Sequence, residues 1–539
     1  MPVVRKDGGT MDILIKGGLI VDGTGEKPFY GDIAIDRDMI TEIGENLDAS
    51  KARKVVDARG LTVTPGFIDG HTHSELNILK NRQHPNALYQ GISTVVTGQC
   101  GLGFAPMKPE LFEDSIKINS GIFGDYRHYL KDWKTFGEFL NQLDGSGVNV
   151  AANVSHNAIR QMVTGFENVV WGEKERREAQ EVIRQTMKEG AVGFSVGLSY
   201  YPGGYSDTEE LIALCQVVQE YDGLFCVHQR LDDGQVPLRP RYEAAEIARK
   251  TGVRLNMLHY RTGSMEEDYH TLFEPFKDIE AAGNKVYYEY YPYMVGAGLV
   301  LALVPGWAQQ GSYAEIMKRL TSKELRSKLL KDMDERHKYF FGPDQTATVI
   351  LTKDPYSRDL GRTFAQISEE NHETFSETII RLLVENELQV GFAGVENQSE
   401  ELKKKLYDDQ YKLFMDDRYT IGSDTIPAGM LCHPRGFGSF ARIIAHMRDR
   451  NVPVEYIVKK LTSMPAEMYR LEGRGVLKAG MKADICLLNY ASVKDQATFE
   501  DPRQRATGVE ALYINGLPAL EHGNITGILA GHALRRGEK

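Results

Sequence analysis

The feature that most constrains this chain is a repeated pattern of short apolar runs, each of which ends in a polar residue and precedes a stretch long enough for a helix. Successive runs that hold Ser195, His228, His259 and Glu289 are spaced by 33, 31 and 30 residues. This pitch matches one strand–helix unit, and continuous apolar runs suit parallel strands that are covered on both faces.

Eight runs of this kind follow one another along the chain. They are LTVTPGFIDGHTH ending at His73, STVVTGQC at Cys100, VNVAANVSH at His156, AVGFSVG around Ser195, LFCVH at His228, RLNMLH at His259, KVYYEYYPY around Tyr291 and YTIGSD at Asp424. The pattern predicts an α/β fold, a (β/α)8 barrel in which active residues lie at the carboxyl ends of the strands.

The two ends of the chain show a different pattern, in which apolar and polar residues alternate between glycine turns. MDILIKGGLIVDGTG lies near one end, and ADICLLNY and VEALYINGLPAL lie near the other. Alternation of this kind is typical of half-buried strands. We therefore expect residues 1–61 and 475–539 to form one small β-sandwich domain, and residues 62–474 to form the barrel.

Two intervals of the barrel are long enough to hold insertions, near 101–147 and 295–418. The second contains charged segments such as SKELRSKLLKDMDERHKY and QSEELKKKLYDDQYKL, which are typical of solvated helices. Two interpretations remain open for this insertion. It is either a helical decoration of the surface or a lid over the barrel mouth.

Composition excludes several classes of protein. The 539 residues are 42% hydrophobic and 26% charged, with a net charge of −11, so the chain offers no polybasic field for nucleic acid. The longest apolar stretch, Val295 to Val304, is too short to cross a membrane. Five scattered cysteines and the absence of an apolar signal segment favour a reducing, cytoplasmic location. The oligomeric state stays open.

Five potential metal ligands end these runs. His71 and His73 are two residues apart after a strand, so both imidazoles can face one metal ion. Cys100 ends the next run, and a thiolate is a strong zinc ligand, although a buried cysteine is often only a small apolar residue. His228 and His259 each close a strand in the same way. We expect all five side chains to converge at one rim of the barrel.

Asp424 ends the eighth run and is the candidate general acid and base. An aspartate at this position can simply cap the next helix. Beside a metal, however, its carboxylate can take a proton from an attacking water and pass it to a leaving nitrogen. His156 also ends a run, but it can equally serve a turn or the start of a helix.

The motifs resemble those of the amidohydrolase superfamily and, within it, the N-acyl-D-amino-acid deacylases or D-aminoacylases. The resemblance spans PGFIDGHTH, GISTVVTGQCG, GAVGFSVGLSYYP, VHQR, LHYR, YPY, IGSD, HPRGFGSF and GRGVLKAGMKAD. It implies a metal-dependent hydrolase barrel with one tight zinc ion at Cys100, His228 and His259. It also implies a second, weaker metal position at His71 and His73.

The same resemblance implies residues that bind the substrate. Arg435 would hold the substrate carboxylate with help from Tyr291 and Arg261, and Tyr200 would approach the scissile carbonyl. Arg261 occupies a position where the family usually has lysine, and Glu75 and Gln99 also differ from the residues that are usual in the family's motifs. These departures affect the choice of substrate rather than metal binding.

The predicted activity is zinc-dependent hydrolysis of the amide bond of a small N-acyl amino acid, with the D configuration implied by the resemblance alone. One alternative is a cyclic-amide hydrolase of the dihydropyrimidinase or hydantoinase kind. Those enzymes generally bridge two metals with a carboxylated lysine on strand four, where this chain has AVGFSVG and no lysine. A second alternative is a non-catalytic scaffold, which has no physical reason to keep all these residues together.

Overall fold

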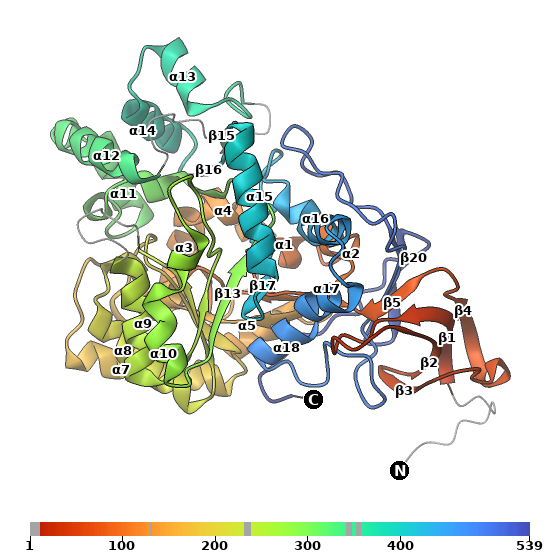
Figure 1. The fold of residues 1–539 in the computed structure, drawn as a ribbon. Helices are drawn as coiled ribbons and strands as arrows, with labels where there is room; N and C mark the ends of the chain where they lie inside the picture. The colour runs from red at the N-terminus through yellow and green to blue at the C-terminus, as the bar shows by residue number, and fades with distance from the viewer. Residues whose placement is uncertain (1–10, 130–131, 231–238, 341–347, 352–356, 539) are drawn as a thin grey trace.

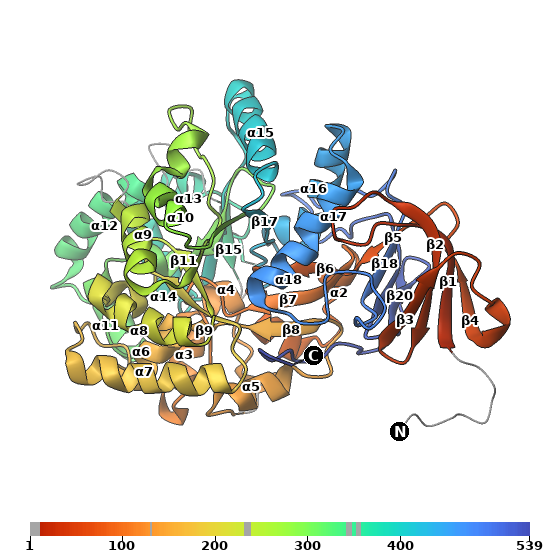
Figure 2. The same cartoon turned by 60° about the horizontal axis from the view of Figure 1, so that its bottom comes forward.

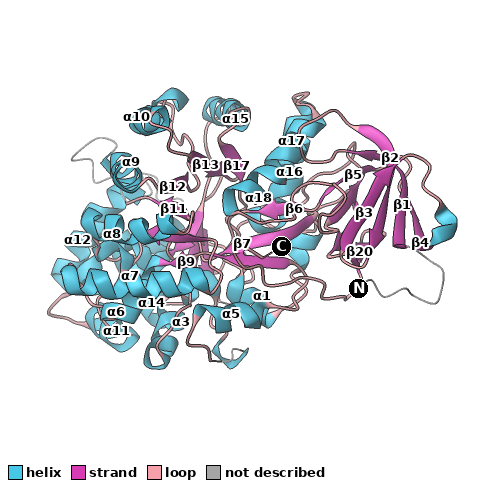
Figure 3. Cartoon of the chain, turned by 90° about the horizontal axis from the view of Figure 1, so that it is seen from below, coloured by secondary structure: helices cyan, strands magenta, loops and turns pink. Residues whose placement is uncertain are grey.

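The structure is a computed structural model that describes residues 11–129, 132–230, 239–340, 348–351 and 357–538. A β-rich part that contains β1 to β5 lies on one side of the molecule (Figure 1), and a barrel wrapped by helices occupies the other side. The same arrangement is visible when the molecule is turned (Figure 2 and Figure 3).

The barrel is a ring of parallel strands. Its strands in the described chain are β6 (Phe67–Asp69), β7 (Ile92–Thr97), β8 (Asn149–Ala152) continued by β9 (Val154–Ser155), β10 (Gly193–Gly197), β11 (Leu224–His228), β12 (Arg254–Met257), β13 (Val286–Tyr290) and β17 (Tyr419–Ile421). Neighbouring strands pair in parallel throughout. A parallel bridge between Thr72 and Thr425 closes the ring. The predicted barrel of eight strand units is therefore confirmed.

Helices follow the strands and cover the barrel from outside, as Figure 1 shows. They are α1 (Glu75–Lys80), α2 (Pro85–Leu88), α6 (His156–Thr164), α7 (Glu173–Lys188), α8 (Thr208–Glu220), α9 (Arg239–Thr251), α10 (Lys277–Ala281), α15 (Glu400–Phe414), α16 (Arg435–Asp449), α17 (Val454–Leu461) and α18 (Ser463–Tyr469). In α7 the buried residues Ala179, Ile183 and Met187 recur every four positions, so one apolar stripe faces the barrel. Side-chain caps fix the starts of α6 and α8, where Ser155 and Asp207 accept from backbone amides.

The interior of the barrel is packed with side chains and is not a channel. Ile68, Val96 and Leu224 from the strands meet Met468 and Tyr469 from α18 in one buried cluster. The Tyr469 hydroxyl donates to the Gly70 carbonyl at 2.9 Å, directly below the first pair of predicted ligands. This core forms the floor on which the rim residues stand.

Both termini contribute strands to the β-rich part. Its strands are β1 (Met11–Ile20), β2 (Phe29–Asp36), β3 (Met39–Gly44), β4 (Ala52–Asp57), β5 (Thr62–Pro65), β18 (Ile485–Leu488), β19 (Val509–Ile514), β20 (Leu517–Glu521) and β21 (Asn524–Ile525). Hydrogen bonds join these nine strands into one sheet, in which β18 from one end of the chain pairs with β5 from the other. The finer description as a separate β-sandwich, with boundaries at residues 61 and 475, stays a prediction.

The insertions hold both helices and a small sheet. The first contains α3 (Phe112–Ile118), α4 (Ser120–Phe123) and α5 (Phe136–Leu143), and the second contains α11 (Tyr313–Thr321), α12 (Arg326–Phe340), α13 (Phe364–Asn371) and α14 (Phe375–Glu385). The strands β14 (Ala297–Leu299), β15 (Thr348–Leu351) and β16 (Val390–Ala393) form an antiparallel sheet that the sequence did not predict. Runs of three or four residues carry too little alternation to be recognised as strands.

None of the helices in the described part of the chain combines the length and the apolar character that a membrane span requires.

Candidate metal centre and active site

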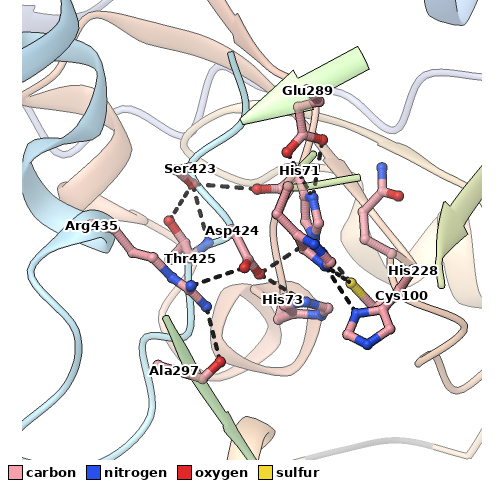
Figure 4. Close-up of polar contacts among 12 residues, drawn as sticks. His71, His73, Cys100, His228, Glu289, Ala297, Ser423, Asp424, Thr425 and Arg435 are labelled. Atoms are coloured by element: carbon pink, nitrogen blue, oxygen red, sulfur yellow. Dashed lines mark hydrogen bonds and ion pairs between the residues drawn. The ribbon is translucent and has the colours of Figure 1, made fainter. Parts of the chain in front are cut away.

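The ends of five barrel strands bring the predicted ligands and the predicted acid–base residue into one cluster (Figure 4). The cluster consists of His71 and His73 after β6, Cys100 after β7, His228 at the end of β11, His259 after β12 and Asp424 after β17. The carboxyl ends of parallel barrel strands meet at one rim, which explains why residues so distant in sequence become neighbours.

Three residues of this cluster adopt backbone conformations that are unusual for residues other than glycine. Cys100, His259 and Asp424 have φ angles of 52°, 39° and 51°, in the left-handed region. Such conformations cost about 1–3 kcal/mol each and persist where the surrounding structure enforces them. At Gly197 a Cβ atom would lie 1.8 Å from the Cys100 carbonyl oxygen, so the cysteine loop and β10 approach each other too closely for any side chain there. The backbone therefore turns these side chains toward a common point.

Cys100, His228 and His259 form one group of donor atoms. Cys100 Sγ lies 3.7 Å from His259 Nε2, and His259 Nε2 lies 2.9 Å from His228 Nδ1. On a tetrahedral zinc ion a sulfur and a nitrogen are about 3.6 Å apart and two nitrogens are about 3.3 Å apart, given bond lengths near 2.3 and 2.0–2.1 Å. The three atoms thus have nearly the spacing of a tetrahedral zinc site.

His71, His73 and Cys100 form a second group, which shares the thiol with the first. Cys100 Sγ lies 3.3 Å from His71 Nε2. Asp424 Oδ1 lies 3.3 Å from the same His71 nitrogen and 3.2 Å from His73 Nε2. The carboxylate therefore faces the second group of ligands, as Figure 4 shows.

Burial keeps the imidazoles of the first group neutral. It lowers the pKa of His228 to about 4, and burial together with the neighbouring His228 lowers the pKa of His259 well below its usual range. Burial also raises the pKa of the Cys100 thiol to about 11, against an opposing effect of His71. Neutral imidazoles are ready to bind a cation, whereas the thiol must lose its proton when a metal binds.

His71 is the charged member of the second group, whereas burial lowers the pKa of His73. Burial alone would lower the pKa of His71, but Glu289, Cys100 and Asp424 together raise it well above the usual range. Burial alone would raise the pKa of Asp424, but Arg435 and the imidazoles of His71 and His73 hold it well below its usual range. Asp424 is therefore an ionised carboxylate.

A cavity of about 490 Å³ opens above these residues. Its lining includes His73, Cys100, Tyr200, His228, His259, Tyr291 and Asp424 from the barrel side, and Val295, Gly296, Gly298, Leu299, Phe392 and Val395 from the second insertion. The insertion thus forms a wall of the cavity and is not only a decoration of the surface.

The two arginines that were predicted to bind substrate lie behind this lining. The guanidinium carbons of Arg435 and Arg261 lie 4.7 and 4.9 Å from the centroid of the Tyr291 ring. Arg435 is fully buried, and its Nη1 forms an ion pair with Asp424 Oδ2 at 2.9 Å. At Gly296 a Cβ atom would lie 2.9 Å from the Tyr291 hydroxyl and 3.9 Å from Arg435 Nη1. Because Gly296 has no side chain, space is left at this point of the wall beside the Tyr291 hydroxyl and Arg435 Nη1.

A family model for the amidohydrolase family matches residues 54–519, which include every residue of the cluster. The chain belongs to the amidohydrolase family. The D-aminoacylase of Alcaligenes xylosoxydans xylosoxydans is 29% identical to it over 541 residues, which cover 99% of each chain.

Two solved structures show that the similarity extends to the whole fold of this amidohydrolase. A D-aminoacylase structure that concerns the functional role of a binuclear metal centre is 26% identical, with a TM-score of 0.78 and coverage of 98% of this chain and 100% of that one. The N-acyl-D-glutamate deacylase of Bordetella bronchiseptica, in complex with zinc and a phosphonate mimic of the tetrahedral intermediate, is 25% identical. Its TM-score is 0.78, and the match covers 97% of this chain and 99% of that one.

Sequence reasoning missed the residues that support the predicted metal ligands of this amidohydrolase. His71 Nδ1 lies 3.0 Å from both carboxylate oxygens of Glu289, a residue 218 positions away. Asp69 accepts from the backbone amide of Ser423 at 2.8 Å and so fixes the segment that leads to Asp424. One signal was available, because a carboxylate inside the tyrosine-rich run VYYEYYPY is unusual unless it has a buried partner.

His156 lies outside the cluster. It is the first residue of α6, and its Nε2 lies 2.7 Å from Glu210 Oε1. Glu210 also accepts a hydrogen bond from Arg160 at 2.5 Å. The residue that caps α6 is Ser155, so His156 does not cap the helix, and its buried contact with Glu210 instead joins α6 to α8.

Proposed function

We propose that this amidohydrolase hydrolyses the amide bond of small N-acyl amino acids, with a preference for the D configuration. The single observation that carries the proposal is the convergence of one thiol, four imidazoles and one ionised carboxylate beside one cavity. The similarity to D-aminoacylases over nearly the whole chain supports the substrate class and its configuration.

The residues present fit a zinc ion. Sulfur and imidazole nitrogen are ligands that zinc prefers, and three of the donor atoms have nearly the spacing of a tetrahedral site. The buried His73 Nδ1 lacks a hydrogen-bond partner among the described residues, whereas its Nε2 faces the cluster. Cys100, His228 and His259 would hold the tight ion, and His71 and His73 a weaker one. When bound, zinc supplies Lewis-acid chemistry that polarises the amide carbonyl and makes a water molecule acidic near neutral pH.

Asp424 is the proposed proton carrier. Its Oδ2 is held by Arg435, which leaves Oδ1 facing His71 and His73. In this orientation Oδ1 accepts a proton from the attacking water and returns it to the nitrogen of the leaving amine. The buried surroundings keep bulk water from competing for that proton.

Tyr200 and the residues around Tyr291 are proposed to orient the substrate. Tyr200 lines the cavity with its ring 5.0 Å from the His228 ring, so its hydroxyl can donate to the oxygen of the scissile carbonyl. Arg435 and Arg261 place positive charge behind Tyr291, beside the point where Gly296 lines the cavity without a side chain. A guanidinium fork suits a carboxylate, so this corner would receive the substrate carboxylate.

Cyclic amides are the weaker alternative. In hydantoinase-like relatives a carboxylated lysine on strand four would be needed, but β10 contains no lysine. Ser195 of β10 instead accepts from the Gly101 amide at 3.0 Å and donates to the Gly98 carbonyl at 2.5 Å. The side chain at the centre of strand four therefore hydrogen-bonds to the loop that contains Cys100.

The test is a panel of N-acyl-D-amino acids, N-acyl-L-amino acids and a hydantoin, assayed with zinc added and after chelation. We expect zinc-dependent release of free amino acid from the D series, with little from the other two classes. Hydrolysis of the hydantoin alone would favour the cyclic-amide alternative, and no hydrolysis of any substrate by zinc-loaded protein would contradict the proposal.

A further inference from the structure

His228 faces the metal ligands with a different nitrogen from its neighbours. His71 and His259 turn Nε2 toward the Cys100 sulfur, at 3.3 and 3.7 Å. His228 instead turns Nδ1 toward His259, at 2.9 Å. Binding through Nδ1 requires that the single proton of the neutral imidazole be carried by Nε2.

The outer nitrogen of His228 contacts a serine hydroxyl. His228 Nε2 lies 2.7 Å from the Oγ of Ser199, whose residue is only 3% exposed. The backbone around this serine is fixed beside β11, because the Leu198 amide donates to the His228 carbonyl at 3.1 Å and the Tyr200 amide donates to the Gly197 carbonyl at 3.0 Å. The hydroxyl is therefore held in place to accept a hydrogen bond from Nε2.

We propose that Ser199 is a positioning residue that holds His228 in the tautomer and orientation in which Nδ1 binds the metal. The inference rests on the metal site of the proposed function, but not on the identity of the substrate. Partners that hydrogen-bond to the outer nitrogen of a ligating histidine fix its tautomer, and their removal typically weakens metal binding about 10–100-fold.

The other imidazoles show that this support differs between the two metal positions. His71 has a carboxylate partner, Glu289, at its outer nitrogen. The outer nitrogen of His73 has no partner among the described residues. Ser199 thus serves the first group of ligands alone, so its effect should be confined to the tight metal position.

The experiment compares zinc affinities of the full chain and its Ser199 variants by competition with a chromophoric chelator. Ser199→Ala should weaken the tight zinc position about 10–100-fold. Ser206→Ala is the matched control, because Ser206 lies in the same connection, is 6% exposed and donates at 2.8 Å to the Gly203 carbonyl instead of a ligand. We expect this control to keep the affinity of the unchanged protein.

A second pair of variants isolates the hydroxyl if Ser199→Ala fails to fold. Ser199→Thr and Ser199→Val introduce side chains of nearly equal volume, of which only threonine has an acceptor for Nε2. We expect zinc to bind more tightly to the threonine variant. At saturating zinc both should recover the same KM, because the serine acts through the metal and does not touch substrate.

The outcomes separate this inference from the proposed function. Equal zinc affinity in folded Ser199→Ala and unchanged protein, or in the threonine and valine variants, would overturn the role of Ser199. Tight zinc binding that weakens in Ser199→Ala would support it even if no N-acyl amino acid were hydrolysed. A chain that binds no zinc at all would overturn both proposals.

Discussion

Both ends of the barrel bury polar groups, but the partners of these groups differ between the two ends. At the amino end, Asp484 is 5% exposed and accepts from Arg474, from Asn149 at 3.1 Å and from the Asn515 amide at 2.8 Å. At the carboxyl end, His71 and Cys100 are equally enclosed and His259 is half-buried, but their donor atoms face one another. Partners of opposite charge satisfy the buried groups at the first end, whereas at the second end the potential ligand atoms also converge on one another.

Burial of polar groups therefore does not by itself identify the active end. The distinguishing feature is the convergence of lone pairs, because left-handed backbone occurs at both ends, at Cys100 and His259 and also at His84 and Asn515. Natural structures rarely leave buried polar atoms without partners unless an ion, a water molecule or a substrate completes them. If the two ends are independent, a change at one end should leave the other intact.

The largest expected effect is that of Asp424→Asn at the carboxyl end. The amide cannot accept the proton of the attacking water, so kcat should fall about 10⁴-fold. Zinc content should stay unchanged, since the ligands of the tight position are intact. Steady-state kinetics together with metal analysis check this, and activity close to that of the unchanged protein would exclude Asp424 as the proton carrier.

The primary effect of Cys100→Ala should be on metal binding and not on the catalytic step. Complete zinc sites in small peptides are worth about 10–16 kcal/mol, so the loss of one of the three proposed protein ligands should weaken binding about 10³-fold. Metal analysis after dialysis should show the loss of the tight ion. Cys215→Ala, at a cysteine buried in the helical layer, is the control that should retain zinc. Full zinc content in the Cys100 variant would place the tight site elsewhere.

Arg474→Met tests the amino end. Arg474 is 8% exposed, pairs with Asp484 and donates to Asn515 Oδ1 at 2.8 Å. Its removal leaves a buried carboxylate without its cation, which should lower the free energy of unfolding by about 3 kcal/mol. Denaturant unfolding measures this change. Zinc content and kcat of the folded protein should not change, and a loss of either would show that the two ends are coupled.

The sequence predicted the barrel and its rim better than the contacts behind the rim. The eight apolar runs and their terminal residues were readable because strand patterns are local, and parallel strands place those ends together. The bond between His71 and Glu289 joins residues 218 positions apart, and which nitrogen each imidazole presents depends on its rotamer. The position of Arg435 behind Tyr291 likewise depends on packing between a helix and an insertion, which no local pattern encodes.

The smallest expected effect concerns pH and a histidine at the amino end. His84 is 1% exposed and lies in a loop at the amino end, where the Arg82 carbonyl accepts a hydrogen bond from the Gly147 amide just before β8. Burial lowers the pKa of His84 to about 4. Between this value and about 6.5 the unfolded chain binds the proton and the folded chain does not, so acid favours unfolding. His84→Asn removes this contribution, and asparagine tolerates the left-handed φ of 48° at this position.

The stability deficit of His84→Asn at pH 7 should therefore shrink by about 2 kcal/mol at pH 4.5, measured by denaturant unfolding. His372→Asn is the matched control, because His372 has a φ of 55° but lies on the surface. An equal deficit of the His84 variant at both pH values would show that His84 takes up its proton in the folded state. The amino end would then be less tightly closed to water than its packing indicates, and the contrast between the two ends would be one of degree only.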